Sequence, residues 1–374
     1  MILNINRNLI QTKIFHPLNE NSILCKFNFI SLIKYNIKKS NMADFQFEKN
    51  LVLNYIKELD KADPESVAEV ISKYASPNFH LRCVHPFNDL VGAENIANKF
   101  WSPIKKSFMP IQRRMDIFYA GTNLIDNHSS KWVVNMGHFL GLFNESFLGI
   151  IPTRKAAMLW YCEFYKIENN KITEGSLFLD IMKFMQQLQL PVVPESTGMI
   201  GFNPGPMTHD GLNFKRQPEE EGKKTLDLII RMANRLVGEG MKTTIPDLEK
   251  DWNKDMLWGG PGGIGASYTY EGYLKGHTGP FEDGLDYVEF TGHIVENAEG
   301  NYGVWFGWPN LLMRPKGNYM GLTSATDKVG EMRVVDLYRR EKGKLAENWI
   351  FIDHLHFLKC VGIDLLDRYK KTNE

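Results

Sequence analysis

Two segments of this chain resemble each other without a gap, and this internal repeat limits the folds that the sequence can adopt. Residues 164–184, FYKIENNKITEGSLFLDIMKF, align with residues 337–357, LYRREKGKLAENWIFIDHLHF, at an offset of 173 residues. Seven of the 21 aligned positions are identical, and the polar turns ENNK and EKGK fall in register. A chance match between two hairpins would be weaker, so the sequence predicts two related halves.

Each half begins with helical stretches and continues as strands. Apolar residues follow the 3.6-residue helical period in 47–60, 64–74, 223–238 and 245–254. A further helix is expected at 92–108 and at 270–281. Segments rich in Val, Ile, Phe, Tyr and Trp predict four strands in each half: 113–120, 131–141, 157–167, 175–184, 288–296, 302–312, 331–340 and 348–357. Helices followed by an antiparallel sheet place each half in the α+β class.

Composition divides the chain further. Residues 191–221 are rich in Pro, Gly and charge, which is typical of a linker. This segment separates a predicted domain at 42–190 from a second at 222–374. Residues 1–41 are rich in Asn, Ile and Lys and lack periodicity. They are interpreted as a disordered or spurious extension before a start at Met42, with a targeting peptide as the alternative.

The overall composition restricts the partners of the protein. The 44 Lys and Arg balance the 44 Asp and Glu, which gives no electrostatic reason to expect nucleic acid or a membrane surface as partner. The four cysteines lack metal-type spacing, so reduced thiols in a cytoplasmic protein are expected. Aromatic residues make up 12% of the chain and suit an apolar pocket. We expect a hydrophobic small-molecule ligand and pairing of the two domains within the chain, and we leave a homo-oligomer open.

Six segments of the chain together carry a family resemblance: HPFNDLVGAENIANKFWSPIKKSF (85–108), LDIMKFMQQLQL (179–190), DMLWGGPGGIG (255–265), GHTGPF (276–281), NYMGLTSATDK (318–328) and VVDLYRREKGKLAENWIFIDHLHFLKCVGID (334–364). These segments resemble the SnoaL-like polyketide cyclase family of the NTF2-like superfamily. The resemblance implies two tandem cone-shaped domains, each a curved antiparallel sheet packed on its N-terminal helices. It also implies a cyclase or isomerase that needs no cofactor and acts on a hydrophobic carbonyl compound by general acid/base catalysis. The alternative is a non-catalytic module for small-molecule binding or protein interaction.

The same resemblance places the catalytic carboxylate at Asp353, with its duplicate at Asp180. Asp353 lies among apolar residues, and burial raises the pKa of a carboxyl group toward neutrality, as proton transfer at neutral pH requires. A structural aspartate that binds loop amides or a histidine is the alternative interpretation. On a strand, Trp349 would share the face of Asp353, and His354 and His356 would share the opposite face.

Aromatic and histidine side chains are expected to bind the substrate in the second half: Trp258, Trp305, Trp349, His354 and His356. The two histidines lack a third ligand at a metal-type spacing, so no metal is expected. The GPGGIG run at 260–265 has the glycine spacing of a dinucleotide-binding loop. Because no βαβ unit surrounds it, it is interpreted as a loop at the rim of the pocket.

The first half departs from this pattern around its aspartate. Ser176 stands where the second half has Trp349, and Lys183 stands where it has His356. A lysine close to Asp180 would hold that carboxylate ionised and lower its pKa. The second pocket is therefore predicted to be the competent one.

Overall fold

The first half begins with helices and ends in long strands. The computed structural model describes residues 44–239 and 242–372, so the interpretation of residues 1–41 lies outside the described residues. The elements of this half are α2 (Gln46–Lys61), α3 (Val67–Tyr74), β1 (Ala75–Cys83), β2 (Asn88–Val91), α4 (Ala93–Ile96), η2 (Ala97–Trp101), α5 (Ser102–Ser107), β3 (Phe108–Thr122), β4 (Lys131–Phe143), β5 (Ala156–Glu168), β6 (Lys171–Leu179) and α6 (Ile181–Gln187).

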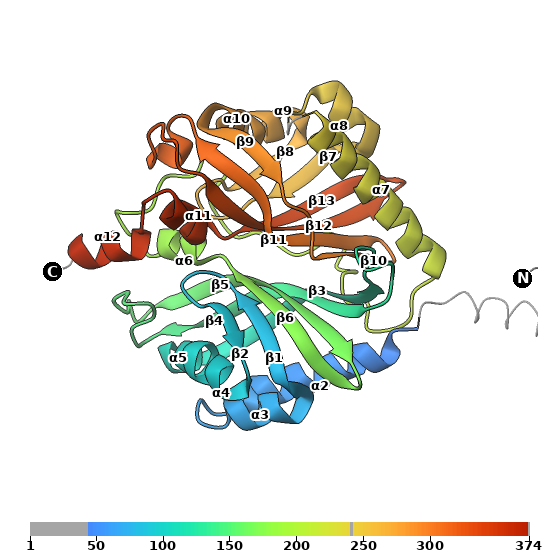
Figure 1. Cartoon of the computed structure of the whole chain (residues 1–374), viewed down its shortest axis with the longest axis vertical. Coiled ribbons are helices and arrows are strands. Elements are labelled where there is room, and N and C mark those ends of the chain that lie inside the picture. Colours follow the sequence, from blue (N-terminus) through green and yellow to red (C-terminus); the bar gives the residue numbers. More distant parts are fainter. Residues whose placement is uncertain (1–43, 240–241, 373–374) are drawn as a thin grey trace, which may run out of the picture. The chain divides into compact units, whose positions relative to one another are not determined.

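The second half repeats this succession. Its elements are α7 (Glu219–Gly238), α8 (Ile245–Asp251), β7 (Trp252–Gly259), β8 (Ala266–Tyr268), α9 (Thr269–Tyr273), η3 (Leu274–Thr278), α10 (Gly279–Gly284), β9 (Leu285–Phe290), β10 (Val295–Glu299), β11 (Tyr302–Pro315), η4 (Tyr319–Gly321), β12 (Gly330–Glu341), β13 (Lys344–Ile352), α11 (His354–Cys360) and α12 (Leu365–Thr372). In each half the N-terminal helices cover one face of a curved sheet, which is a mixed α+β arrangement (Figure 1).

Both sheets have the same strand order. The first runs β2-β1-β6-β5-β4-β3, and the second runs β8-β7-β13-β12-β11, with β9 and β10 both paired to β11. The place of the long strand β3 is thus divided between β9 and β10. This shared order is what a duplication predicts. The duplication and the division into two domains stay predictions, because both halves belong to one compact unit, Ala43–Glu374.

Each sheet contains one parallel pair, so the prediction of wholly antiparallel sheets is wrong in this respect. β1 pairs with β6 in parallel, and β7 pairs with β13 in parallel. β1 and β7 were not predicted, because ASPNFHLRC and WNKDMLWG lack the clean alternation of apolar and polar residues that marks a half-buried strand. Both strands precede the short helices, and a chain that returns through helices can pair in parallel.

The β5–β6 and β12–β13 hairpins turn on residues with positive φ angles. Asn169 and Asn170 have φ values of 50° and 63°, and Lys342 and Gly343 have 52° and 81°. Two central residues with positive φ match the twist of antiparallel strands, and Asn and Gly adopt this conformation most readily. The two polar turns that the repeat aligned therefore share one backbone conformation.

Replacing Gly343 by Ala should lower the free energy of unfolding by about 1 kcal/mol, because an L-residue is strained at positive φ. No atom lies within 4 Å of the added Cβ, so the loss measures backbone strain alone. Gly238→Ala is a matched control, since Gly238 ends α7, is equally uncrowded and needs no positive φ. Urea unfolding of both variants tests this expectation, and equal losses would contradict it.

The two sheets pack on each other through the faces opposite their helices. On β11, the Phe306 ring lies 4.4 Å from the Phe164 ring and 6.1 Å from the Trp132 ring, measured between centroids. The Trp160 and Phe351 rings are 4.0 Å apart. Because strand side chains alternate, the neighbours of these residues point toward the helices of their own half. Each half therefore keeps an inner face between its sheet and its helices.

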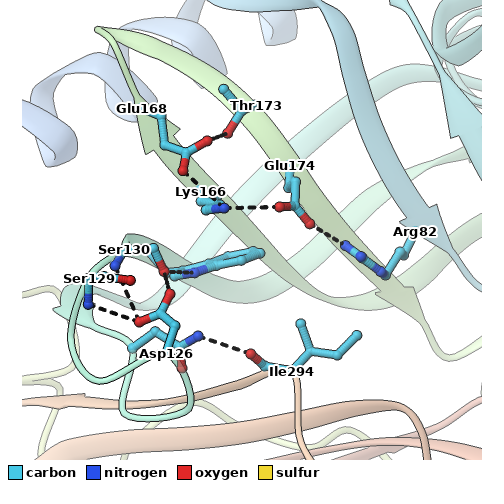
Figure 2. Close-up of polar contacts among 11 residues, drawn as sticks. Arg82, Asp126, Ser129, Ser130, Lys166, Glu168, Thr173, Glu174 and Ile294 are labelled. Atoms are coloured by element: carbon cyan, nitrogen blue, oxygen red, sulfur yellow. Dashed lines mark hydrogen bonds and ion pairs between the residues drawn. The ribbon is translucent and has the colours of Figure 1, made fainter.

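Charged side chains accompany the apolar ones on the face of the first sheet that carries Phe164. Glu174 accepts hydrogen bonds from Arg82 at 2.9 Å and from Lys166 at 3.1 Å (Figure 2). The same view shows the loop after β3, where Asp126 accepts from Ser130. The side-chain amide of Asn123 in this loop donates to the Ile294 carbonyl at 3.0 Å, which links it to the second half.

The segment 191–221 contacts both halves along its length. Met199 forms an isolated β-bridge with Ala266, and Leu212 forms one with Phe118. The side-chain N–H of Trp349 donates to the Pro204 carbonyl at 2.8 Å. The connection is therefore fastened to the protein at several points. Among the helices of the described residues, none combines the length and the apolar character needed to cross a membrane.

Candidate active site in the second half

A cavity of about 100 Å³ lies between the sheet of the second half and helices α7 to α10. Its lining is largely aromatic and aliphatic, and it includes two of the residues that the sequence analysis expected there, Trp258 and Trp305. Charged residues of α7 and α8, among them Arg235 and Asp251, lie along another part of the lining. The strand side of the cavity is mainly apolar, which is how small-molecule sites are usually lined.

Alternation along β12 and β13 decides which side chains enter this cavity. Every second residue of β12 from Met332 to Tyr338 lines it, and on β13 the same holds for Asn348, Ile350 and Ile352. Asp336 is the one acidic residue among these strand positions. The residues between them, such as Phe351, face the first half. The cavity is therefore lined by the face of β13 that carries Ile350, and the face that carries Phe351 is turned away from it.

Asp336 is a buried carboxyl group with little to stabilise its charge. The side-chain amide of Asn348 donates to its Oδ1 at 2.8 Å. None of the ion pairs among the described residues includes Asp336. Burial raises its pKa to about 8, because the low dielectric of the surroundings disfavours the charged form. A carboxyl group that titrates near neutral pH can both give and take a proton at that pH.

His277 of η3 provides a neutral polar group in the wall. Its ring stacks on Trp258 with the centroids 4.0 Å apart. Burial lowers the pKa of His277 to about 3, so the ring is uncharged at neutral pH. Its Nδ1 is buried and has no hydrogen-bond partner among the described residues. An orphaned polar atom beside a cavity is available to a ligand.

The structure places Asp353 and Asp180 elsewhere, at the first turns of short helices. Asp353 is the N-cap of α11 and accepts the His356 backbone N–H at 3.2 Å, and Asp180 is the N-cap of α6 and accepts the Lys183 backbone N–H at 2.9 Å. Each also accepts a backbone N–H from the other half. His85 donates to Asp353 and Gly262 donates to Asp180, both at 2.9 Å.

These contacts match the alternative interpretation of the two aspartates, in which they bind loop amides. The Nη1 atom of Arg333 also lies 3.3 Å from the Oδ2 atom of Asp353, which forms an ion pair. Burial raises the pKa of both carboxyl groups, against the opposing effect of the amides and cations around them. The lowered pKa expected for Asp180 is therefore wrong, because burial outweighs the charge of Lys183. Neither aspartate lines the cavity that contains Asp336. Their catalytic role stays a prediction.

The predicted residues His354 and His356 do not continue the strand beyond Asp353. β13 ends at Ile352, and the chain continues as α11, so the expected alternation through His354 and His356 is wrong. The side chain of His354 hydrogen-bonds the Tyr319 hydroxyl at 3.0 Å, and that of His356 hydrogen-bonds Glu331 at 3.0 Å. The strand ends before these histidines because Asp353 caps the helix that follows, α11.

The first half has a different arrangement at the position equivalent to Asp336. The repeat offset places Glu163 there. Glu163 is ion-paired with Arg113 at 2.6 Å and accepts a hydrogen bond from Asn135 at 2.7 Å. The guanidinium of Arg113 in turn lies over the Phe139 ring at 4.6 Å. The carboxylate of the first half is thus neutralised inside its core, whereas the carboxyl group of the second half has no cation.

A sequence signal for Asp336 existed. The aligned repeat begins one position after the Glu163/Asp336 pair, and an acid inside the apolar run VVDLY (334–338) is as unusual as one inside IFIDH. Extending the alignment by one residue would have found a duplicated acid on the inner face. As for metals, the described residues contain no group of three His, Cys, Asp or Glu side chains that could hold an ion.

Comparisons with known proteins find similarity at the level of structure. No family model matches the chain, and no curated protein sequence matches it. A proposed polyketide cyclase of Acidithiobacillus ferrooxidans is 16% identical, with a TM-score of 0.32, over 40% of this chain and 98% of its own. A proposed SnoaL-like polyketide cyclase of Shewanella denitrificans is 19% identical, with a TM-score of 0.31, over 38% and 96%. An NTF2-like protein of Burkholderia thailandensis is 14% identical, with a TM-score of 0.30, over 38% and 97%.

Proposed function

We propose that the second half binds a hydrophobic, carbonyl-containing small molecule, of cyclic or polyketide-like character, and transfers a proton at the carbon next to its carbonyl group. The observation that carries this proposal is the buried carboxyl group of Asp336, which forms no ion pair among the described residues and faces a largely aromatic and aliphatic cavity. Such a group is costly to bury, and an enzyme that abstracts protons without a cofactor needs a base of this kind.

The proposed reaction uses the two protonation states of Asp336. The ionised carboxylate removes a proton from the α-carbon, and the electrons of the broken C–H bond move into the C–C bond of an enolate. The protonated Asp336 then returns the proton, either to the same carbon or to another carbon of the conjugated system. With a pKa of about 8, a minor fraction of Asp336 is ionised at pH 7, and this fraction increases with pH. No redox partner is required.

Neutral groups in the wall support the enolate stage. Negative charge that develops on an oxygen in an apolar cavity is stabilised mainly by fixed hydrogen-bond donors. Tyr273, Tyr338 and His277 line the cavity as neutral groups. Burial raises the pKa of both tyrosine hydroxyls, so they keep their protons, and burial keeps His277 uncharged. In this proposal a bound carbonyl oxygen accepts a hydrogen bond from Tyr273 or His277, because the Tyr338 hydroxyl already interacts with Asp336.

Deuterium exchange into a simple cyclic ketone tests the proposal. Cyclohexanone is incubated in D₂O with the full chain, and mass spectrometry measures deuterium uptake at its α-carbons. We expect the protein to accelerate exchange well above an equal concentration of free acetate. Val334→Phe, which adds bulk two residues before Asp336 on the cavity face, should remove most of this acceleration. Thermal unfolding confirms that the variant is folded.

The outcomes separate the enzyme from a binding module. If cyclohexanone raises the melting temperature of the wild type but its α-protons do not exchange, the cavity binds without catalysis. If neither effect is seen for a series of cyclic ketones, the cavity is not a site for this class of compound. Only acceleration that Val334→Phe removes supports the proposed function.

A further inference from the structure

A second cavity, of about 220 Å³, lies on the face of the first sheet that is turned away from the helices of its own half, beneath residues 199–203 of the connecting segment. It shares no lining residue with the cavity that contains Asp336. Trp160 and Lys183 form part of its wall, and Ile200 and Phe202, which are 65% and 50% exposed, lie at its edge. The cavity is therefore apolar and reachable from solvent.

Lys183 lines this cavity and forms no direct ion pair among the described residues. Its Nζ lies 4.9 Å from the centroid of the Trp160 ring and 3.5 Å from the Gly260 carbonyl oxygen. None of the ion pairs among the described residues includes it, because the nearby Asp180 carboxylate is bound by the backbone amides of Lys183 and Gly262. Burial lowers the pKa of Lys183 to about 8, against the opposing charge of Asp180. At pH 8 about half of the amine is therefore neutral, and a neutral amine is a nucleophile.

A histidine that can move protons faces the same cavity. The Nδ1 of His138 hydrogen-bonds Asp116 Oδ2 at 2.8 Å. The His138 ring lies 4.5 Å from the Phe202 ring and 6.4 Å from the Trp160 ring. Burial lowers the pKa of His138, which leaves the ring neutral. With the Nδ1 proton directed to Asp116, Nε2 is the nitrogen that accepts a proton.

Trp160 adds an independent sign that the cavity is built for a ligand. The residue is 2% exposed, and its side-chain N–H has no acceptor among the described residues. Buried donors are nearly always bonded, so an orphaned one beside a cavity marks a place for an acceptor atom. A nucleophilic amine, a proton carrier and an unused donor thus share one apolar chamber.

We propose that this cavity binds an apolar aldehyde or ketone, which forms an imine with Lys183. The Lys183 nitrogen adds to the carbonyl carbon, and the carbinolamine then loses water to give a C=N bond. His138 takes a proton from nitrogen and returns one to the departing hydroxyl group. The step consumes no oxidant or reductant. The Trp160 N–H is the donor available to an oxygen of the ligand. This site is independent of the proposed chemistry at Asp336.

Reductive trapping of the imine tests the proposal. The full chain is treated with benzaldehyde and sodium borohydride at pH 8, and peptide mass spectrometry locates the benzylamine product. Lys166 is the internal reference, since its ion pairs with Glu168 and Glu174 raise its pKa despite partial burial. We expect Lys183 to be labelled on the order of 100-fold faster than Lys166, because far more of its amine is neutral. Labelling should increase steeply from pH 7 to pH 9.

Three variants make the result decisive. Lys183→Arg keeps a long basic side chain but removes the nucleophilic amine, so it should abolish the rapid labelling. His138→Gln should slow the labelling without moving it to another lysine. Asp336→Asn should leave it unchanged. Labelling of Lys183 no faster than that of Lys166 would overturn the proposal. Labelling of Lys183 at the wild-type rate in the His138→Gln variant would overturn the role given to His138. Because an imine also exchanges α-protons, the ketone assay is repeated in Lys183→Arg, where exchange by Asp336 should persist.

Discussion

Asp336→Asn should lower the rate of α-proton exchange by ~10²–10⁴, whereas Asp353→Asn should leave the rate within a few-fold of wild type. Asparagine keeps the shape of the side chain and removes the group that takes the proton. Asp353 lies outside the cavity, and its oxygens are occupied by backbone amides and Arg333. The pair of variants therefore separates the acid inside the cavity from the acid that caps a helix.

The pH dependence of exchange provides a second readout of the same residue. If the ionised form of Asp336 is the base, the wild-type rate should increase through pH 7 and level off above its pKa of about 8. Asp180→Asn should behave like Asp353→Asn in this assay. A large loss in Asp353→Asn at a temperature where the variant stays folded would instead support the role predicted from the sequence, and the assignment to Asp336 would then fail.

Asp336→Asn should also change how stability depends on pH, by on the order of 5 kcal/mol between pH 4 and pH 9. The pKa of Asp336 increases from 3.8 to about 8 on folding. Between these values the folded protein holds a proton that the unfolded chain releases. Stability therefore falls as pH rises across this window, and the contribution is fully present only below the unfolded pKa.

Asparagine has no such proton, so the variant should lack this part of the pH dependence. Relative to wild type, it should become progressively more stable from pH 4 to pH 9. Urea unfolding at both pH values measures the difference, and taking the difference cancels titrating groups that both proteins share. Asp353→Asn is a less clean control, because it removes the ion-pair partner of Arg333 and should itself destabilise that variant at neutral pH. A difference between Asp336→Asn and wild type that does not vary with pH would show that Asp336 is ionised in the folded protein.

The sequence predicted the parts of this fold that depend on local pattern. The aligned hairpins share strand pairing and turn conformation, and the helices around 92–108 and 270–281 occur with small shifts. β1 and β7 escaped because Pro77 and the polar residues of each strand obscure its period. Their pairing with β6 and β13 is set by contacts distant in sequence.

The site was harder to predict because it depends on which face of a strand is inside. Asp336 and Asp353 look alike in the sequence, because each is an acid within an apolar run that predicts a strand. Three features of the structure distinguish the two acids. β13 ends at Ile352, Asp353 caps the helix that follows, and Asp336 accepts a hydrogen bond from Asn348. The amides that satisfy Asp353 and Asp180 come from the opposite half of the chain, and no local pattern announces them.

The backbone hydrogen bond that each half donates to the capping aspartate of the other half also bears on how the chain is made. The backbone N–H of His85 binds a carboxylate that lies 268 residues further along the chain. At ~5–20 residues per second, a ribosome adds that carboxylate on the order of 15–50 s after it has added His85. During this interval the loop at His85 cannot reach its native hydrogen bonding, however well the strands around it have formed. A segment of the second half that is synthesised late thus completes the hydrogen bonding of a loop in the first half.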